Sequence, residues 1–365
     1  MINVDFFPSK RIALYMARTF ILRSLAVLAA LVLVLMTLDL LGESGKILRQ
    51  PGNGDAQLWH YVSLRVPMLV ARFLPFSVLL GTLITLATLN QNSEIVSMKA
   101  AGISAHQIIA PLVVASLAVA AISFAFNERI VTRASATLNA WEAVDYGPVP
   151  PSTGVSSNVW VRHGDNLILA RQVSGSGADT ILKKISVYHR TNDILTHLVS
   201  AESARPNGDA WTLEKVEIFD VAKNEARKVA RLRGGEGVDA NQFTLAKVSA
   251  DEIDFATLQR AITDLKQSGR PTGALEAALW HKISGPMSAI LMPLLAAVAA
   301  FGLARSGQLF LRAVIGMGLG FAYFVADNFA LAMGNFGAYP PWLAAWGPFM
   351  LFLLIGETVL IRTEE

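Results

Sequence analysis

Charged side chains lie inside or at the edge of long apolar stretches of this sequence, where they need a partner or a ligand. Asp39 and Asp327 are acids, and Arg65 and Arg72 are bases seven residues apart. An ionisable group costs about 2.5–3.5 kcal/mol or more at the centre of a membrane, so it normally faces protein, water or a ligand. The two arginines either hold an anionic ligand or form a structural ion pair with Asp39. Asp39 is equally compatible with solvation at the membrane surface, and Asp327 is expected to face protein or water.

The sequence lacks the motifs of self-contained catalysis. It contains no Gly-x-x-x-x-Gly-Lys-Ser/Thr loop for nucleotide phosphates, no His-Glu-x-x-His zinc pair and no Gly-x-Ser-x-Gly nucleophile turn. It also has no cysteine, which excludes disulfides, thiolate metal sites and cysteine nucleophiles. We therefore expect no enzyme, no metal site and no cofactor bound by this chain.

A short segment, residues 91–106, lies between two long apolar stretches and is too polar to span a bilayer. As a helix it places Met98 and Gly102 on one face, with Glu94 and Lys99 beside that face. A short helix with an apolar face fits a groove in a partner protein. The alternative is a helix resting on lipid headgroups, which usually carries more basic charge than one lysine.

The elements that position these residues are those of an integral membrane protein. Of 365 residues, 53% are hydrophobic and 16% are charged, against about 25% charged in globular proteins. The net charge of +3 is too small to suggest nucleic acid as a partner. A helix of about 20 apolar residues crosses a bilayer. Six stretches meet this standard: 20–41, 66–89, 108–126, 279–304, 313–333 and 342–361.

Basic residues predict the orientation of these six spans. Short loops rich in lysine and arginine stay in the cytoplasm, so both termini are expected there. Lys46 and Arg49, just after the first span, are exceptions that need a separate reason. The residues that follow the rule are Lys10, Arg11, Arg18, Arg23, Lys99, Arg305, Arg312 and Arg362.

Residues 128–277 form a polar domain between the membrane segments 1–127 and 278–365. Short β-type runs alternate with turn signals such as Asn207-Gly208, which strongly favours a hairpin. About seven such runs predict an antiparallel sandwich or jelly roll outside the cytoplasm, and therefore an α+β membrane protein. Helical spacing at 255–269 predicts a linker helix. The strand candidates are 159–162, 167–170, 181–189, 194–204, 211–221, 225–233 and 242–248.

The fifth span carries Gly316 and Gly320, four residues apart. Small residues at this spacing let two membrane helices approach closely. The contact is either a static packing seam or one that shifts during function.

Several motifs together resemble the lipopolysaccharide export permeases, the LptF/LptG family, and its LptG branch more closely. Six spans with a β domain between the third and fourth agree with that family. The matching segments are 93–104, 279–288, 303–306, 316–327 and Tyr339-Pro-Pro341.

The resemblance implies a subunit of an ABC exporter in the bacterial inner membrane. An LptF–LptG heterodimer would sit on two LptB ATPase subunits, which bind ATP and magnesium, with LptC alongside. Lipopolysaccharide would leave the outer leaflet between the first and fifth spans. It would then pass along periplasmic β-jellyrolls to an LptA bridge.

The resemblance also implies roles for individual residues. Glu94 would be the carboxylate that meets a basic group of the ATPase, and Asp39 and Asp327 match acidic positions of LptG. Where well-known LptG members have adjacent lysines just past the first span, this chain has Gly42-Glu43. Lys46 and Arg49 follow, and are candidate contacts for lipid phosphates.

Two other classes of function remain open. An ion-coupled transporter would use Asp39, Arg72 and Asp327, but its expected inverted repeats are not evident and the β domain would have no role. A membrane-anchored envelope scaffold would bind other proteins through the β domain. That reading leaves Glu94 and the intramembrane charges unexplained.

Overall fold

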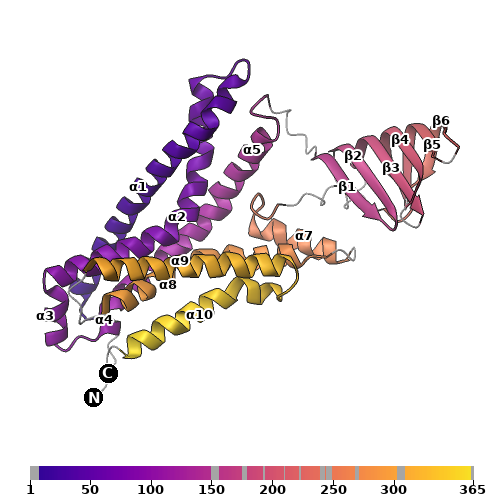
Figure 1. Cartoon of the computed structure of the whole chain (residues 1–365). Helices are drawn as coiled ribbons and strands as arrows, with labels where there is room; N and C mark the ends of the chain where they lie inside the picture. Colours follow the sequence, from indigo (N-terminus) through magenta and orange to yellow (C-terminus); the bar gives the residue numbers. More distant parts are fainter. Residues whose placement is uncertain are drawn as a thin grey trace. The chain divides into compact units, whose positions relative to one another are not determined.

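The chain folds as two compact units, seen here in a computed structural model (Figure 1). A helical unit combines Met1–Gly147 with Ala250–Glu365, and a β unit comprises Pro148–Ser249. The motif at 303–306 and, apart from Phe243, the strand expected at 242–248 lie outside the described residues. The structure describes residues 8–148, 156–174, 179–191, 194–208, 210–221, 223–238, 243, 249–267, 271–301 and 309–362.

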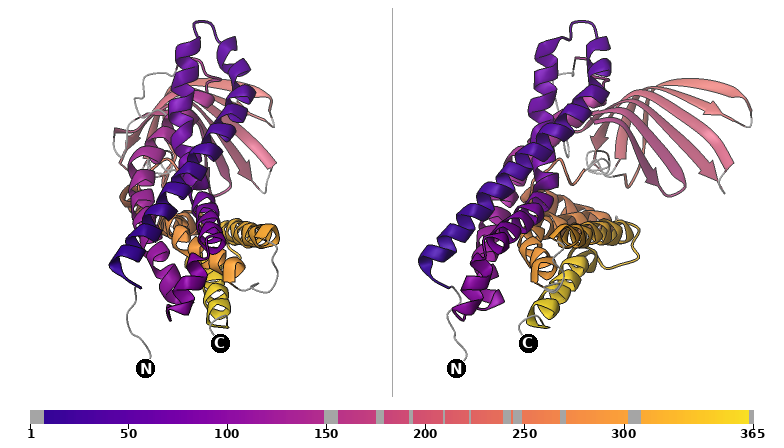
Figure 2. Two further views of the ribbon diagram at one scale, coloured as in Figure 1. Left: turned by 90° about the vertical axis from the view of Figure 1, so that its left-hand side faces the viewer. Right: turned by 60° about the vertical axis from the view of Figure 1, so that its left-hand side comes forward.

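Among the described residues, six helices are long and apolar enough to cross a membrane, as the sequence predicts. The longest are α1 (Lys10–Arg49) and α2 (Asp55–Gln91), which lie side by side (Figures 1 and 2). At 1.5 Å per residue each is about 55–60 Å long, whereas the hydrocarbon core of a bilayer is about 30 Å thick. The others are α4 (Ala105–Phe126) with its extension, α8 (Gly273–Phe301), α9 (Leu309–Asn335) and α10 (Pro341–Arg362).

The third apolar helix continues past the end of its apolar stretch. After α4 the chain passes through a π-helical turn, η1 (Asn127–Val131), into α5 (Thr132–Glu142). Leu138 and Trp141 of α5 are buried in a cluster that includes Tyr61 of α2. Packing against neighbouring helices sustains a helix beyond the residues that hydropathy selects.

Short elements complete the helical unit. α3 (Glu94–Ala100) connects α2 to α4, and α4 begins at a capping box formed by Ser104 and Gln107. α7 (Phe255–Gln267) occupies the segment where a linker helix is expected. α8 is the most enclosed span, because 67% of its most apolar window is buried, against 17% in α1 and 22% in α9.

The described part of the β unit is one antiparallel sheet with its six strands in sequence order. Figure 2 shows the strands as a single curved layer. Asn207 pairs with Ala210 in a tight hairpin, and Gly208 between them has the positive φ of 67° that such turns favour. The strands are β1 (Ser156–His163), β2 (Asn166–Ser174), β3 (Ile181–Thr191), β4 (Ile194–Asn207), β5 (Ala210–Asp220) and β6 (Glu225–Gly234).

These elements are those of an α+β membrane protein with six apolar helices and a separate sheet. In the sequence the sheet follows the third apolar helix and precedes the fourth. A jelly roll consists of two packed sheets, and the described strands form a single meander. The jelly-roll topology therefore stays a prediction.

Candidate functional site

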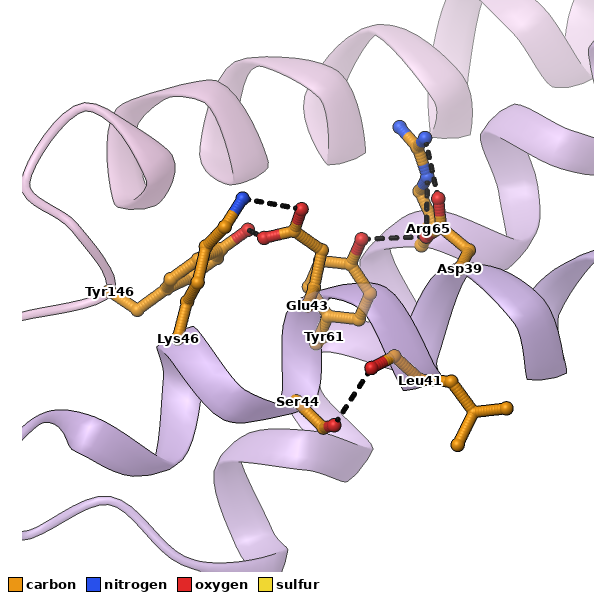
Figure 3. Close-up of polar contacts among 8 residues, drawn as sticks. All are labelled: Asp39, Leu41, Glu43, Ser44, Lys46, Tyr61, Arg65 and Tyr146. Carbon is orange, nitrogen blue, oxygen red and sulfur yellow. Dashed lines mark hydrogen bonds and ion pairs between the residues drawn. The ribbon is translucent and has the colours of Figure 1, made fainter.

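A network of polar side chains joins α1 and α2 near the ends where the two helices connect (Figure 3). Asp39 accepts hydrogen bonds from Nε and Nη2 of Arg65, both at 3.0 Å. The Tyr61 hydroxyl donates a third bond to Asp39 at 2.6 Å. The side chains of Arg65 and Asp39 are 29% and 23% exposed, so solvent screens this two-bond pair only partly. Of the two alternatives for Arg65, the structure favours the ion pair with Asp39.

A second pair lies one turn further along α1. Glu43 accepts hydrogen bonds from Lys46 and from the Tyr146 hydroxyl, both at 2.8 Å. Burial raises the pKa of Tyr146, and the Glu43 carboxylate raises it further, so the hydroxyl keeps its proton at neutral pH. Lys46 is still 63% exposed, and Arg49 is exposed in the last turn of α1. The helix dipole favours cations at this end, which is the separate reason that these two basic residues need.

Further hydrogen bonds fix the segment that follows α5. Gln50 donates to the backbone oxygen of Asp145 at 2.8 Å. Asn53 donates to the backbone oxygens of Ile47 and Tyr146, both at 2.9 Å. The connection between α1 and α2 is thereby tied to the end of the third apolar helix.

A cleft of about 520 Å³ lies inside the helical unit, between α2, α4, α8 and α9. Arg72, His281 and Asp327 are among the side chains that line it. Asp327 is 8% exposed, and its Oδ2 lies 3.9 Å from Nε2 of His281. Its Oδ1 meets no hydrogen-bond donor among the described residues. The structure thus brings Arg72 and Asp327 to one cleft and adds a histidine that the sequence does not single out.

Lys282 also lines the cleft, but it forms an ion pair with Glu128 at 3.1 Å. Their side chains are only 9% and 14% exposed. Glu128 belongs to the π-helical turn η1, and its other oxygen accepts a hydrogen bond from the backbone N–H of Phe255, the first residue of α7. One carboxylate therefore joins the third apolar helix to α7 and α8.

Gly316 and Gly320 face neighbouring helices inside the helical unit. A Cβ atom at Gly316 would lie 2.8 Å from Leu83 on α2, and one at Gly320 would collide with Leu79 on α2. Gly318 has no such neighbour within 4 Å. The two glycines allow α9 to pack closely on α2, and a shift of this contact during function stays a prediction.

The short helix α3 packs its apolar face on its own chain. Ile95 is buried and Met98 is half-buried against the core of the helical unit. Glu94 is half-buried, whereas Val96 and Lys99 are exposed. The exposed residues of α3 are therefore Val96, Ser97, Lys99 and Ala100, with the half-buried Glu94 at its start.

Specific contacts fix both ends of α3. At its start, the Tyr15 hydroxyl of α1 lies 3.4 Å from the Glu94 carboxylate. At its end, Gly102 has a φ of 82°, and its N–H and that of the next residue bond back to oxygens of the last helical turn in a Schellman motif. A side chain at this φ would strain the backbone. Gly102 therefore shapes the end of α3.

One face of the sheet is apolar and carries a cavity of about 190 Å³. Burial lowers the pKa of His189, which lines this cavity, and His197 lowers it further, so His189 is neutral at pH 7. Apolar side chains make up most of its lining, which suits an apolar group. Its apolar lining includes Ile168, Leu182, Ile185, Val187, Val199, Trp211, Leu213, Leu232 and Phe243.

Sequence reasoning identifies Asp39, Arg65, Arg72 and Asp327 but misses their partners, and it misses both members of the buried pair Glu128–Lys282. Tyr61 and Tyr146 complete the network on α1, and His281 pairs with Asp327. A tyrosine near an apolar stretch carries no charge signal, so spacing does not select it. His281 falls in the motif 279–288, which is the one signal that points to it.

Among the described residues, no three histidine, aspartate or glutamate side chains are grouped to bind a metal ion. The acid–histidine pairs Asp327–His281, Asp220–His197 and Glu357–His106 contain two such side chains each. The charged side chains of the α1–α2 network and of the cleft can form ion pairs and hydrogen bonds with a ligand.

Known proteins are similar to this chain along almost its whole length. A family model described as lipopolysaccharide export system permease LptF/LptG matches residues 14–362. The lipopolysaccharide export system permease protein LptG of Escherichia coli strain K12 is 27% identical over 352 residues, which are 94% of this chain and 95% of that protein. LptG of the O6:H1 strain of Escherichia coli aligns with the same identity and coverage. LptG of Haemophilus influenzae is 26% identical over 358 residues, covering 93% of this chain and 97% of its own length.

Proposed function

Because the chain belongs to the LptF/LptG family of lipopolysaccharide export system permeases, we propose that it is the LptG-like membrane subunit of an ABC exporter. It extracts lipopolysaccharide from the outer leaflet of the inner membrane and has no catalytic residues of its own. Each methylene group exposed to water costs about 0.8 kcal/mol, so baring the acyl chains of such a lipid would cost tens of kcal/mol. A workable extractor therefore keeps the chains covered along the whole path.

The chain crosses the inner membrane six times, with both termini in the cytoplasm and the β unit in the periplasm. Support comes from basic residues at helix ends: Lys10 and Arg11 start α1, Lys99 lies between α2 and α4, and Arg362 ends α10. These positions share one side if consecutive spans alternate in direction, and that side is cytoplasmic. Lys46 is then periplasmic.

The lipid enters sideways between α1 and α9 of this chain and an LptF-like paralogue, with the LptC helix alongside. Support comes from the low burial of α1 and α9, which are 17% and 22% buried in their most apolar windows. Large apolar side chains of α9 are exposed at intervals of three or four residues, which is the spacing of one helix face. They are Val314, Met317, Phe321, Val325 and Phe329.

Exposed cations at the periplasmic end of α1 contact the lipid phosphates. Lys46 and Arg49 are the candidates, because both are exposed in the last turn of that helix. Arg65 is already engaged by Asp39 and serves to hold α1 against α2. Lys46 also pairs with Glu43, but at 63% exposure it stays accessible to a ligand, whereas Arg65 is 29% exposed.

α3 docks on an LptB ATPase dimer, which binds the ATP and magnesium. Support comes from its exposed residues, which include Val96 and Lys99, and from the half-buried Glu94 at its start. The contact between Glu94 and Tyr15 links this surface to α1, one of the two helices beside the lateral entry. A motion of the ATPase that displaces α3 would thereby be passed to α1 through the contact between Glu94 and Tyr15.

The β unit carries the acyl chains as part of a jelly-roll trough that continues into an LptA bridge. The observation that carries this proposal is the cavity on the apolar face of the sheet. Val187 lines that cavity, and its neighbour Ser186 lines the opposite face. Both positions lie on β3, but their side chains lie on opposite faces of the sheet.

The test places a photoreactive amino acid at position 187 or, as the matched control, at position 186. The assembled exporter is illuminated in membranes with and without ATP. Position 187 should capture lipopolysaccharide in an ATP-dependent way, and position 186 should not. Equal capture at both positions contradicts the trough, and capture of proteins alone favours an assembly scaffold.

A further inference from the structure

Among the charged side chains that line the cleft of the helical unit, Arg72 and Asp327 have opposite charges and form no ion pair with each other. Arg72 on α2 is exposed, and Asp327 on α9 is 8% exposed. Arg72 forms no ion pair or hydrogen bond with another described residue. Oδ1 of Asp327 likewise meets no donor among the described residues. A buried carboxylate oxygen without a donor is costly, so this cleft is suited to a ligand that supplies one.

The packing of α2 on α9 places Arg72 and Asp327 at the same level. Gly316 packs on Leu83, Gly320 packs on Leu79, and the rings of Phe324 and Phe76 lie 5.3 Å apart. As residue numbers rise on α9, those of the contacting residues fall on α2, so the helices are antiparallel. One further turn along this series leads to Arg72 on α2 and Asp327 on α9. Both side chains line the same cleft beyond the aromatic contact.

A ligand that matches this pair carries an anion and a group with N–H donors in one small unit. Pockets of about 300–1,000 Å³ accept small ligands, and this cleft of about 520 Å³ is of that size. A metal ion is a poor match, because among the described residues no three acids or histidines are grouped for it. A phosphate beside a primary ammonium group meets both requirements.

The depth of the cleft points to a lipid as the source of that ligand. Asp327 lies eight residues before Asn335, the end of α9, and therefore roughly 12 Å from that end. With a hydrocarbon core of about 30 Å, this level lies inside the bilayer leaflet next to that end of α9. A ligand that enters here comes from the bilayer.

We propose that the cleft binds the phosphoethanolamine headgroup of a membrane phospholipid, with Arg72 on the phosphate and Asp327 on the ammonium group. His281 covers Oδ2 of Asp327 at 3.9 Å, so Oδ1 accepts the ammonium N–H. This site goes beyond the proposed export path, because it holds a headgroup inside the helical unit and needs no ATPase. An exported glycolipid that carries the same phosphoethanolamine group is the second source of this chemistry.

Native mass spectrometry of the purified full-length protein tests the site. The protein is titrated with phosphatidylethanolamine and phosphatidylcholine of identical acyl chains. Choline keeps the positive charge but has no N–H to donate. Wild-type protein should bind the ethanolamine lipid about tenfold more tightly, since a hydrogen bond to a charged group is at stake.

Variants assign the preference to the two side chains. Asp327→Asn should reduce the preference for ethanolamine to less than about twofold, because the acceptor loses its charge. Arg72→Gln should weaken the binding of both lipids by a similar factor and preserve their ratio. Arg129→Gln is the matched control, because Arg129 is exposed and does not line the cleft.

Each outcome decides for or against the proposal. Equal binding of the two lipids by wild-type protein overturns it, even if a variant fails to fold. An ethanolamine preference that survives in Asp327→Asn overturns it as well. In a second arm, lipid A with and without a phosphoethanolamine group is titrated. Tighter, Asp327-dependent binding of the modified lipid A assigns the same site to the glycolipid. Loss of this site would leave the crosslinking test of the β unit unaffected.

Discussion

Replacing Arg65 by methionine removes two of the three hydrogen bonds to Asp39. The carboxylate keeps only the Tyr61 hydroxyl, and α1 loses its ionic contact with α2. Methionine retains an unbranched apolar stem, so the change tests the charge pair more than the packing. We expect α1 to separate from α2 more often at this end.

The expected loss of free energy depends on how far the Arg65–Asp39 pair is shielded from solvent. A hydrogen bond to a charged group contributes about 1.5–3 kcal/mol, and an exposed ion pair contributes about 0.2–1 kcal/mol in total. The side chains of Arg65 and Asp39 are 29% and 23% exposed, which places the pair between these limits. We expect a loss of about 2–3 kcal/mol, equivalent to a roughly 30- to 150-fold change in an opening equilibrium.

The absence of cysteine from the sequence makes this opening measurable without background labelling. Ile47 is fully buried two turns along α1 from Asp39, so a thiol at this position reacts only when the helices separate. In an Ile47→Cys background, Arg65→Met should raise the labelling rate about 30- to 150-fold when reclosing is fast. Each rate is normalised to that of the unfolded variant.

Lys46→Met supplies the control, because it breaks a pair whose lysine is 63% exposed. Its labelling rate should rise by less than about fivefold, as for a surface ion pair. If the labelling rate of Arg65→Met also rises by less than about fivefold, the argument from burial of the Arg65–Asp39 pair is refuted. The Asp39 pair would then contribute no more than a surface contact.

The remaining predictions concern the α3 surface, the glycine contact and the buried ion pair. Glu94→Gln should reduce ATPase copurification and ATP hydrolysis while the chain stays in the membrane. The control is Gln91→Ala, at an exposed neighbouring position, which should change neither. Unchanged ATPase activity with the Glu94 variant excludes the coupling role. Gly316→Val should lower stability by about 1–3 kcal/mol in thermal unfolding because it overpacks the close contact of α9 with α2. Gly318→Val, which meets open space, should have little effect. Equal losses of stability in the two variants would contradict a close contact at Gly316. Lys282→Met should cost about 3–5 kcal/mol, because it leaves a buried carboxylate unpaired; a thermal unfolding temperature within two degrees of wild type would contradict this.

Hydropathy predicts the apolar cores of the six long helices but not their ends. Bilayer thickness sets the length of an apolar stretch, so such stretches can be recognised in the sequence by their length and composition. The polar extension α5 follows instead from the burial of Leu138 and Trp141 against α1 and α2. Such packing depends on residues far apart in the chain, which a local window of sequence does not contain.

The strands were predictable for a similar reason, because alternation and turn residues are local signals. The Asn207-Gly208 turn and its flanking runs predict the β4–β5 hairpin, and pairing of Asn207 with Ala210 confirms it. The arrangement of whole sheets is a long-range property. A jelly roll and a single meander share the same strand signals, so strand patterning alone does not separate them.

Several charged residues of the candidate sites stand out in the sequence, but Glu128 and Lys282 do not, and none of the pairings does. Asp39 and Arg65 are 26 residues apart, and Glu128 and Lys282 are 154 residues apart. The first pair lies in two consecutive spans, so it could be proposed as one of two alternatives. The second spans the whole β unit, and no spacing rule connects its members.

The sequential order of the strands leaves β1 and β6 with a neighbour on one side only among the described strands. An unpaired edge invites other chains to add a strand, which is a route to aggregation. β6 displays Arg227, Lys228, Arg231 and Arg233, all of them exposed. Two copies that aligned along β6 would bring these like charges together, so the charge of this edge disfavours strand pairing between copies.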